Sequence, residues 1–510
     1  MPTATLPQHY TDLIALQRES GTLGSIAANI SWDQETYMPA GGAGARAEQS
    51  SLLAGIIHER NTSSKLGDLL AQCEADADLS DESTPEGASL REMRRDYDLA
   101  TKLPTDLVKA LALAQSTAQE TWKKSRANND FPSFVDDLTK VLDLTREKGE
   151  CYGYKEGGEV YDALINEYEP DTTAKEIEVV FTPLRDRLSA FIKDLTENGT
   201  APKVDFLHRS IAVEKQHAFG QAITAQLGFD YNTGRLDTTT HPFCSGFGPG
   251  DTRMTTRYEP TNFPDAVGST MHECGHGLYE QGLPKGGALF GTPLAAAVSL
   301  GIHESQSRMW ENMVGRGKPF WNWALPVANK HFDNAFEDID LDTFVKSMNT
   351  CTPSFIRVES DESTYNLHVM LRFELERAMI NGDLAIKDLP GAWNEKFKNF
   401  LGLDVPDDTT GCLQDVHWSF GLVGYFPTYT LGNLYAAQMW ETINETIPDL
   451  DAQMAKGEFG ALLSWLRENI HQHGRRYSAA QLCQRATGKP LDAAPLMRHL
   501  ERRVKPAYCM

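Results

Sequence analysis

The run His272-Glu273-Cys274-Gly275-His276 contains residue types whose spacing suits the activation of a water molecule by a metal ion. Two histidines four positions apart on a helix have Cβ atoms about 5–6 Å apart, so both imidazoles can bind one zinc ion at about 2.0–2.1 Å. Glu273 is then placed to take a proton from the attacking water and to return it to the leaving amine, as in metallopeptidases. With 14 histidines in 510 residues, chance produces this pattern roughly once in every few dozen chains, so its context has to decide.

Helix-start and helix-stop signals flank this run. Asn262 offers an N-cap, Pro264 suits the first turn, and Gly282 followed by Pro284 marks the end. The apolar residues of the segment recur at helical spacing and form one stripe: Val267, Met271, Cys274 and Leu278. At 100° per residue the two histidines point to roughly the opposite side of this helix. The pattern predicts a helix over residues 262–282 that packs by one face and presents the histidines on another.

A catalytic zinc site needs a third protein ligand and one open position. A third histidine on the same helix is excluded, because the positions that would complete the metzincin pattern are Tyr279 and Gly282. Glu280 lies eight residues after His272, which is about 12 Å along the helix axis and too far to share an ion. The third ligand must therefore come from another element.

The next predicted helix covers residues 292–315 and opens with a Thr-Pro pair typical of a cap and first turn. It carries His303 and Glu304, and a helical hairpin of this length can bring either residue back over the two histidines. We favour Glu304, since three neutral imidazoles are less usual with this motif. The alternative is a surface Glu304 that pairs with Arg308 at i+4.

Helical periodicity dominates the rest of the chain. The clearest example covers residues 175–198 and is followed by Gly199 as a stop signal. Similar periods recur at residues 6–19, 134–144, 393–401 and 459–470. Convincing alternating strands are few, and no repeat of fixed period is present. The sequence predicts an all-α, mainly helical protein with few short strands.

Composition narrows the classes of partner. Lys plus Arg total 48 against 71 Asp plus Glu, a net charge of −23, and so acidic a surface repels phosphate backbones and anionic lipids. We therefore expect no nucleic-acid partner. We also expect no membrane partner, since in addition no stretch of 18 apolar residues occurs in the chain. The first ten residues lack the pattern of a secretion signal, and the eight cysteines include no C-x-x-C pair. We expect a soluble, cytoplasmic protein with reduced thiols.

Several short motifs accompany the histidine run in a fixed order. They are residues 32–36 (WDQET), 241–243 (HPF), 251–255 (DTRMT), 303–308 (HESQSR), 356–361 (IRVESD) and 411–418 (GCLQDVHW). With these motifs the chain resembles the carboxypeptidase Taq family of metallocarboxypeptidases over nearly its whole length. One departure is visible, because the family's Ile-Arg block usually ends in Ala-Asp and here ends in Ser360-Asp361.

The resemblance implies His272, His276 and Glu304 as metal ligands and Glu273 as general base and acid. It also implies a mostly helical fold with a deep groove closed at one end, and a homodimer. Zinc is the metal that the resemblance implies, with cobalt or manganese as substitutes.

We expect one catalytic unit over residues 1–510, in which the helix with the histidine run pairs with the helix that carries the glutamate ligand. Residues 1–235 would form a helical part that covers the groove. Residues 236–510 would carry the metal site and the substrate motifs.

An exopeptidase must bind the free α-carboxylate of its substrate, and a planar guanidinium does this with two hydrogen bonds. Arg357 is the first candidate for this substrate-binding role and Arg253 the second. For either residue the alternative is a structural ion pair, for instance Arg357 with Asp361 at i+4.

Residues 419–428 contain Gly421, Gly424 and Pro427, which is typical of an active-site loop. His417 and Tyr425 lie in or beside this loop, where they are candidate catalytic donors to the developing oxyanion. The alternative for each is an ordinary buried hydrogen bond.

We expect His241 and Asp251 to shape the substrate-binding groove or to support the metal site rather than to act on the substrate.

Together these patterns predict a metal-dependent carboxypeptidase of broad specificity that acts on peptides with a free C-terminus. One alternative is an endo-oligopeptidase of the same helical type, which requires a groove without a closed end. Another is a non-catalytic metal-binding scaffold. Loss of Glu273 or of a ligand would indicate a scaffold, and all of these residues are retained.

Overall fold

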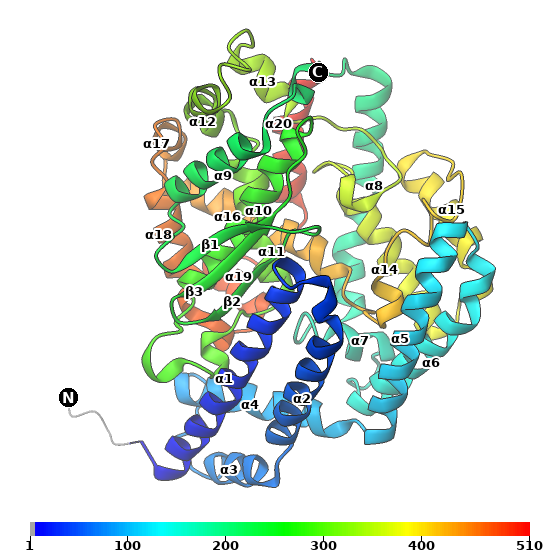
Figure 1. The fold of residues 1–510 in the computed structure, drawn as a ribbon, viewed down its shortest axis with the longest axis vertical. Helices are drawn as coiled ribbons and strands as arrows, with labels where there is room; N and C mark the ends of the chain where they lie inside the picture. The colour runs from blue at the N-terminus through cyan, green and yellow to red at the C-terminus, as the bar shows by residue number, and fades with distance from the viewer. Residues whose placement is uncertain (1–5) are drawn as a thin grey trace. The chain divides into compact units, whose positions relative to one another are not determined.

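The computed structural model describes residues 6–510, and most of these residues lie in helices (Figure 1). The α-helices are α1 (Gln8–Thr36), α2 (Ala43–Asn61), α3 (Ser64–Glu74), α4 (Pro85–Lys102), α5 (Thr105–Asn128), α6 (Val135–Tyr152), α7 (Val160–Ile165), α8 (Ala174–Asn198), α9 (Val213–Leu227), α10 (Phe263–Gly282), α11 (Leu300–Arg308), α12 (Lys318–His331), α13 (Leu341–Ser347), α14 (Tyr365–Asn381), α15 (Leu389–Leu401), α16 (Pro427–Thr446), α17 (Leu450–Met454), α18 (Gly460–Asn469), α19 (Ala479–Thr487) and α20 (Ala494–Ala507). The strands are β1 (Gly234–Thr238), β2 (Cys244–Gly248) and β3 (Asp251–Thr256). The mainly helical fold predicted from the sequence is confirmed.

The chain forms two compact units, each assembled from three segments. The first unit contains the residues up to 101, residues 204–341 and residues 439–490; the second contains residues 102–203, 342–438 and 491–510. Both units draw on residues before and after position 235, so they do not coincide with the two parts expected from the sequence. The covering of a groove by residues 1–235 stays a prediction.

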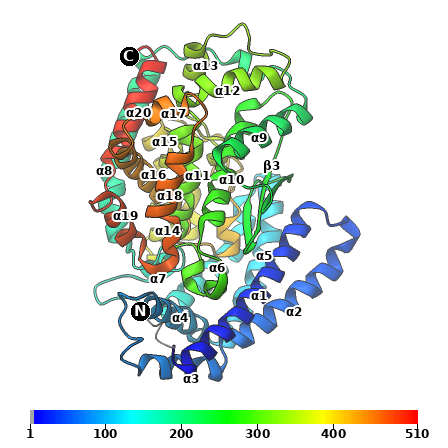
Figure 2. The ribbon, with the colours of Figure 1, turned by 90° about the vertical axis from the view of Figure 1, so that its left-hand side faces the viewer.

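The first unit contains a small sheet in the order β1-β3-β2. β1 runs parallel to β3 and β2 runs antiparallel to it, with an irregularity in the register between Gly246 and Gly248. α10 packs against β3 and β2, and α1 packs against β2. Figure 2 shows α1 and α2 side by side as a helical pair. The sheet thus supports the helix that carries the histidine run.

α10 and α11 approach each other closely, and a glycine makes this possible. A Cβ atom added at Gly275 would lie 2.4 Å from the carbonyl oxygen of Gln306, a distance that no side chain tolerates. The apolar stripe predicted for α10 is buried against its neighbours, with Val267, Met271, Cys274 and Leu278 all below 5% exposed. The predicted helix over residues 262–282 agrees with the structure, although the side chain of Asn262 caps no backbone N–H.

The helix predicted over residues 292–315 begins later than the sequence suggested. Thr292 and the following proline open only a single 3₁₀ turn, Pro293–Ala295, after which the backbone is extended at Ala296. α11 then starts at Leu300, where Ser299 Oγ accepts the backbone N–H of Ile302 at 3.0 Å. It continues into a π-helical segment, Met309–Val314, which ends at the predicted Gly315.

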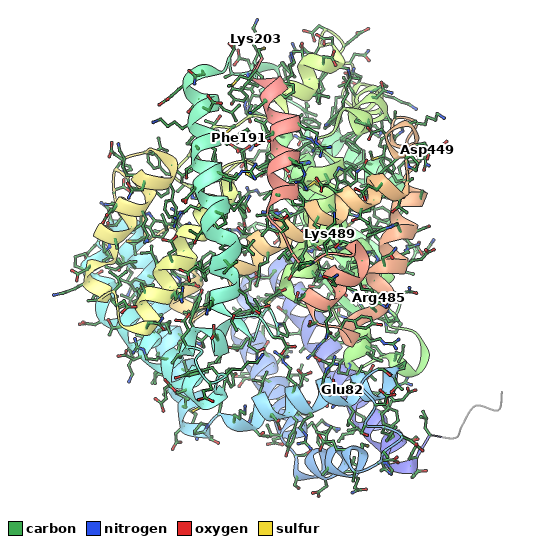
Figure 3. All side chains as sticks on the ribbon, turned by 180° about the vertical axis from the view of Figure 1, so that it is seen from behind. Glu82, Phe191, Lys203, Asp449, Arg485 and Lys489 are labelled. Carbon is green, nitrogen blue, oxygen red and sulfur yellow. The ribbon has the colours of Figure 1, made fainter. Side chains whose placement is uncertain are left out.

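The second unit is built around α14, most of whose residues are buried and which lies against α8 and α15. α8 reproduces the helix predicted over residues 175–198, with a capping box between Thr173 and Glu176 and with Gly199 after its last turn. Figure 3 shows α8, on which Phe191 is labelled, beside α20. This unit therefore has a helical core of its own.

No helix in the described part of the chain has the length and apolar character needed to cross a membrane. All eight cysteines, which lie within the described residues, are free thiols.

Candidate active site

α10 and α11 bring together the three residues predicted to bind a metal ion. Oε2 of Glu304 lies 3.6 Å from Nε2 of His272 and 3.5 Å from Nε2 of His276, and one donor atom from each residue lies within 4.8 Å of the other two. Glu304 is 7% exposed and both histidines are half-buried. Two imidazole nitrogens and one carboxylate oxygen form a donor set suited to zinc.

The other ring nitrogen of each histidine is held by a partner. Nδ1 of His272 lies 2.8 Å from Oε2 of Glu311, and Nδ1 of His276 lies 3.1 Å from the backbone oxygen of His303. With Nδ1 as the donor in both rings, each Nε2 keeps a lone pair directed toward Glu304, which is the state that binds a metal. Burial would raise the pKa of Glu311, but Arg308 and His272 lower it to about 2, so Glu311 accepts as a carboxylate. The residues present fit a divalent metal.

The two oxygens of Glu304 have different partners. Arg308 donates from Nε to Oε1 at 2.7 Å, whereas Oε2 is the oxygen near the histidines. Oε2 also accepts a hydrogen bond from Oγ of Ser307 at 3.2 Å. The ion pair with Arg308, which the sequence offered as an alternative to a ligand role, therefore coexists with a carboxylate oxygen that faces both histidines.

His303, the other candidate for the third ligand, lies behind His276. Its Nδ1 is 2.6 Å from Nδ1 of His276 and its Nε2 is 2.9 Å from Oε1 of Glu280. Both ring nitrogens of His303 therefore already have partners, and His303 lies on the side of His276 that is opposite Nε2 of His276. The geometry favours Glu304 as the third ligand.

Glu273 lies on α10 between the two histidines and is only 5% exposed. Its Oε2 is buried and has no hydrogen-bond partner among the described residues. Burial raises the pKa of Glu273 to about 7, although the nearby His272 opposes this shift. A carboxylate with a pKa near neutrality can both take up and release a proton at physiological pH.

Comparison with known proteins identifies the family. Residues 12–504 match the family model described as Carboxypeptidase Taq (M32) metallopeptidase. The chain belongs to this family. It is 41% identical to thermostable carboxypeptidase 1 of Thermus thermophilus, covering 98% of this chain and 99% of that protein. It is 35% identical to carboxypeptidase 1 of Bacillus subtilis, covering 98% of this chain and 96% of that protein.

Solved structures agree with this assignment. The crystal structure of the carboxypeptidase of this family from Deinococcus radiodurans superimposes with a TM-score of 0.94 at 39% identity, covering 99% of this chain and 100% of that one. The structure of Pyrococcus furiosus carboxypeptidase superimposes with a TM-score of 0.94 at 33% identity, covering 98% of this chain and 100% of that one. The chain is a metal-dependent carboxypeptidase, and peptides are its substrates.

Arg253, the second candidate for binding the substrate carboxylate, belongs to the same unit as the metal-site residues. It donates to both oxygens of Asp251, at 2.9 and 2.7 Å. Its guanidinium also lies over the rings of Trp32 and Phe247, 4.5 and 4.7 Å from their centroids. Because Asp251 balances its charge and two rings cover it, Arg253 is better suited to holding α1 on the sheet. His241 is exposed, just before β2.

Arg357, the first candidate in this carboxypeptidase, is 4% exposed and lies in the second unit. It donates from Nη2 to Oδ1 of Asp415 at 2.8 Å and from Nη1 to the hydroxyl of Tyr365 at 3.0 Å. Asp361 instead accepts backbone N–H groups, among them that of Ser363 at 2.9 Å. The i+4 ion pair between Arg357 and Asp361 was therefore the wrong alternative, since the partner of Arg357 is Asp415.

Asp415 is shared by a second buried arginine that the sequence analysis missed. Arg372, 0% exposed, donates from Nε to Oδ2 of Asp415 at 2.7 Å. Although burial opposes ionisation, Arg357 and Arg372 hold the pKa of Asp415 well below its usual range. Two guanidiniums and one carboxylate leave one positive charge unbalanced, which favours an anionic group beside them. The signal that could have identified Arg372 is its place inside the otherwise apolar run of residues 369–373 (VMLRF).

His417 and Tyr425 lie together in the second unit, with ring centroids 5.5 Å apart. Nδ1 of His417 is 3.8 Å from Oδ1 of Asp415. Burial, together with the two arginines, lowers the pKa of His417 to about 4 against the opposing effect of Asp415. His417 is therefore neutral at pH 7, so it neither adds to nor offsets the excess positive charge of Arg357 and Arg372.

Glu376 holds the segment that carries these two residues. Its carboxylate accepts hydrogen bonds from Nε1 of Trp418 at 2.8 Å, from the backbone N–H of Gly424 at 3.0 Å and from the hydroxyl of Tyr161 at 2.7 Å. Glu376 is 0% exposed, and its burial raises its pKa to about 7 despite these donors. One buried side chain thus holds the loop at Trp418, just before it, and at Gly424, within it.

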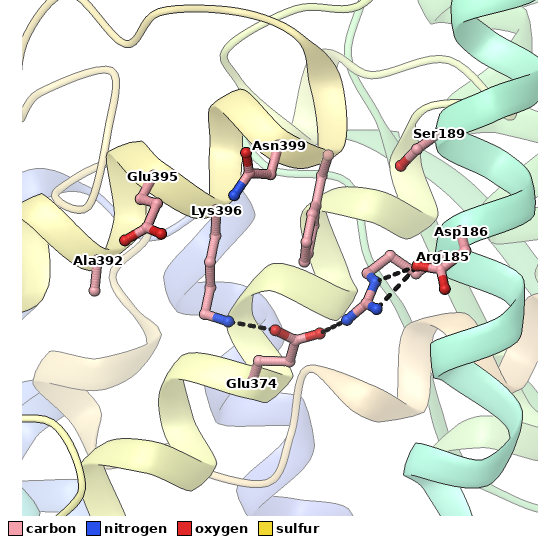
Figure 4. Close-up of a pocket in the computed structure, with 9 residues that line it drawn as sticks. Arg185, Asp186, Ser189, Glu374, Ala392, Glu395, Lys396 and Asn399 are labelled. Atoms are coloured by element: carbon pink, nitrogen blue, oxygen red, sulfur yellow. Dashed lines mark hydrogen bonds and ion pairs between the residues drawn. The ribbon is translucent and has the colours of Figure 1, made fainter.

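A separate pocket of about 530 Å³ opens between α8, α14 and α15 of the second unit (Figure 4). Glu374 lies between Arg185, which donates to it at 2.6 Å, and Lys396. These charges are paired with one another, so the pocket presents a salt-bridge network rather than a second active site.

Proposed function

We propose that this carboxypeptidase releases single residues from the C-termini of peptides, with His272, His276 and Glu304 as the metal ligands and Glu273 as the general base and acid. The observation that carries the proposal is the convergence of two Nε2 atoms and one carboxylate oxygen beside a buried glutamate that has an unpartnered oxygen. A bound divalent ion would lower the pKa of a water molecule and polarise the scissile carbonyl. Zinc suits the donor set, with cobalt or manganese as substitutes.

The role proposed for Glu273 follows from its surroundings. Its unpartnered Oε2 accepts the proton of the attacking water, and its pKa of about 7 allows the same atom to donate that proton to the leaving amine. Because the side chain is buried, the proton is not lost to bulk solvent between the two events.

Arg357 is proposed to bind the substrate α-carboxylate. The pair of arginines around Asp415 carries one uncompensated positive charge, and a carboxylate is the group on a peptide C-terminus that neutralises it. An internal peptide segment or an amide leaves that charge unpaired. This selects for exopeptidase action.

His417 and Tyr425 are proposed to donate hydrogen bonds to the oxygen of the scissile carbonyl as negative charge develops on it. A neutral His417 has one N–H available for this purpose. His241 is proposed to shape the substrate-binding groove.

We also keep a homodimer and a cytoplasmic location as proposals, and light scattering of the purified protein tests the first of them. The experiment that tests the enzymatic proposal is product analysis on an unblocked peptide, which should show free C-terminal amino acids appearing one after another.

A further inference from the structure

We propose that Glu311 is a positioning residue of the metal site, which fixes the ring of His272 and, through Arg308, the carboxylate of Glu304. The inference rests on the proposed binding of a metal by His272, His276 and Glu304. It assigns to Glu311 a role that neither the histidine run nor the other sequence motifs indicate.

The contacts form one continuous chain. Oε2 of Glu311 lies 2.8 Å from Nδ1 of His272 and 3.0 Å from Nη1 of Arg308. Nε of the same arginine donates to Oε1 of Glu304 at 2.7 Å. The side chains of these four residues are 10–18% exposed, so water competes little for these bonds. Two of the three metal-binding residues are thereby held by one arginine–glutamate pair.

Glu311 acts through His272 and is not itself a ligand. Its oxygen faces Nδ1, whereas Nε2 is the nitrogen that points toward Glu304. A carboxylate on Nδ1 keeps the proton there, leaves the lone pair on Nε2 and makes the imidazole a more basic ligand. Nδ1 of His276 faces the backbone carbonyl and the ring nitrogen Nδ1 of His303 instead of a carboxylate, so the two histidines are supported unequally.

The backbone geometry that places Glu311 is unusual. α11 ends at Arg308 and the chain continues as the π-helical segment Met309–Val314, in which Glu311 lies. π-Helical turns are rare and occur often at functional sites, because they change the direction of side chains relative to a regular helix. Glu304, Arg308 and Glu311 follow one another at intervals of four and three residues, so all three remain on the side of the helix that faces α10.

Binding of zinc alone to the purified full-length chain tests this inference. The dissociation constant is measured by competition with a chromogenic chelator for the wild type, Glu311→Ala and Glu311→Gln. We expect Glu311→Ala to weaken zinc binding about 10–100-fold, the usual effect of removing such a partner. The zinc dissociation constant of Glu311→Gln should fall between those of the wild type and Glu311→Ala. The amide oxygen of the glutamine still accepts the Nδ1 proton of His272, but the negative charge is lost.

Glu362→Gln is the matched control. Glu362 is a buried carboxylate 2.8 Å from Nε2 of His499, and its unit contains none of the three metal-binding residues. The dissociation constant of this variant should stay within about twofold of the wild type. The visible spectrum of the cobalt-loaded protein gives a second readout, which should change in both Glu311 variants and not in the control.

The results separate the possible failures. If Glu311→Ala is folded by circular dichroism and binds zinc as tightly as the wild type, while His272→Ala does not bind, Glu311 has no positioning role. If Glu311→Ala does not fold, a Glu311→Gln variant with unchanged zinc affinity and an unchanged cobalt spectrum excludes the positioning role equally. If His272→Ala binds zinc like the wild type, the metal site itself is misassigned and this inference falls with it.

Discussion

Arg308 and Glu304 form a 2.7 Å ion pair through the glutamate oxygen Oε1, which leaves Oε2 directed at the two histidines. One carboxylate thus serves both a structural pair and the metal site. In the proposed site Glu304 would be a ligand through a single oxygen, and the ligand set would depend on α11 as well as on α10.

Removing any one of the three proposed ligands should remove both metal and activity. We expect His272→Ala and Glu304→Ala to lose the equivalent of metal that the wild type retains after dialysis, because two donors hold a divalent ion far less tightly than three. Elemental analysis and peptide hydrolysis, measured on the same samples, check this. A Glu304→Ala variant that is metal-replete and active would overturn the assignment of the third ligand.

Glu273→Gln should keep the metal and lose activity. The substitution preserves the size of the side chain and removes its basicity, so kcat should fall by at least about 10²–10⁴-fold, the usual contribution of a general base. Metal content measured in parallel is the control. Hydrolysis at nearly the wild-type rate would mean that another group moves the proton.

Asp415→Asn should destabilise the fold, because it leaves Arg357 and Arg372 buried without a counter-charge. The expected loss in the free energy of unfolding at pH 7 is about 3–5 kcal/mol, the range for breaking a buried ion pair. Urea unfolding followed by circular dichroism measures it.

The difference in stability between the wild type and Asp415→Asn should depend on pH. The pKa of Asp415 is depressed in the folded protein by the two arginines, which outweigh the opposing effect of burial. Its stabilising contribution is therefore fully present above the unfolded-state pKa of about 3.9 and is lost as the pH falls further. The difference in stability between wild type and Asp415→Asn should be constant from pH 7 to about 5 and should shrink below about 4. A difference that stays the same down to pH 3 would mean that the ionised carboxylate is not what stabilises the pair.

Glu376→Ala should reduce turnover without affecting the metal. The substitution leaves three buried donors, on Trp418, Gly424 and Tyr161, without their acceptor, at a cost of about 1–3 kcal/mol each. The loop with His417 and Tyr425 then loses its fixed position. Tyr161→Phe, which removes one donor and keeps the carboxylate, is the matched control and should lower kcat much less. Equal kcat values for Glu376→Ala and the wild type would exclude a positioning role for this carboxylate.

Local signals predicted much of α10. Its boundaries, its apolar stripe and the pairing of its histidines with Glu304 follow from proline and glycine signals, helical periodicity and ligand chemistry. The start of α11 was predicted wrongly, because a Thr-Pro pair such as that at residue 292 can open a single 3₁₀ turn as well as a long helix. The close contact between Gly275 and the backbone of Gln306, which fixes where the second helix packs, joins segments that are distant in sequence.

Partners distant in the chain account for the other misses. Arg357 and Asp361 are four residues apart, but Arg357–Glu359 is a 3₁₀ turn followed by extended backbone at Ser360, so the helical i+4 geometry does not exist there. Asp415, the real partner, is 58 residues away. Glu311 was missed because its partner His272 is 39 residues away in the chain.

The ratio of cleavage rates for a free-acid peptide and its C-terminal amide is the most direct test of how this enzyme selects its substrate. An amide leaves the excess positive charge beside Asp415 unpaired, which costs several kcal/mol at a buried site. We predict that the free acid is shortened one residue at a time, that the amide is a very poor substrate, and that Arg357→Ala brings the two rates together by slowing the free acid. Amides cut as fast as free acids, with internal fragments as products, would contradict the account.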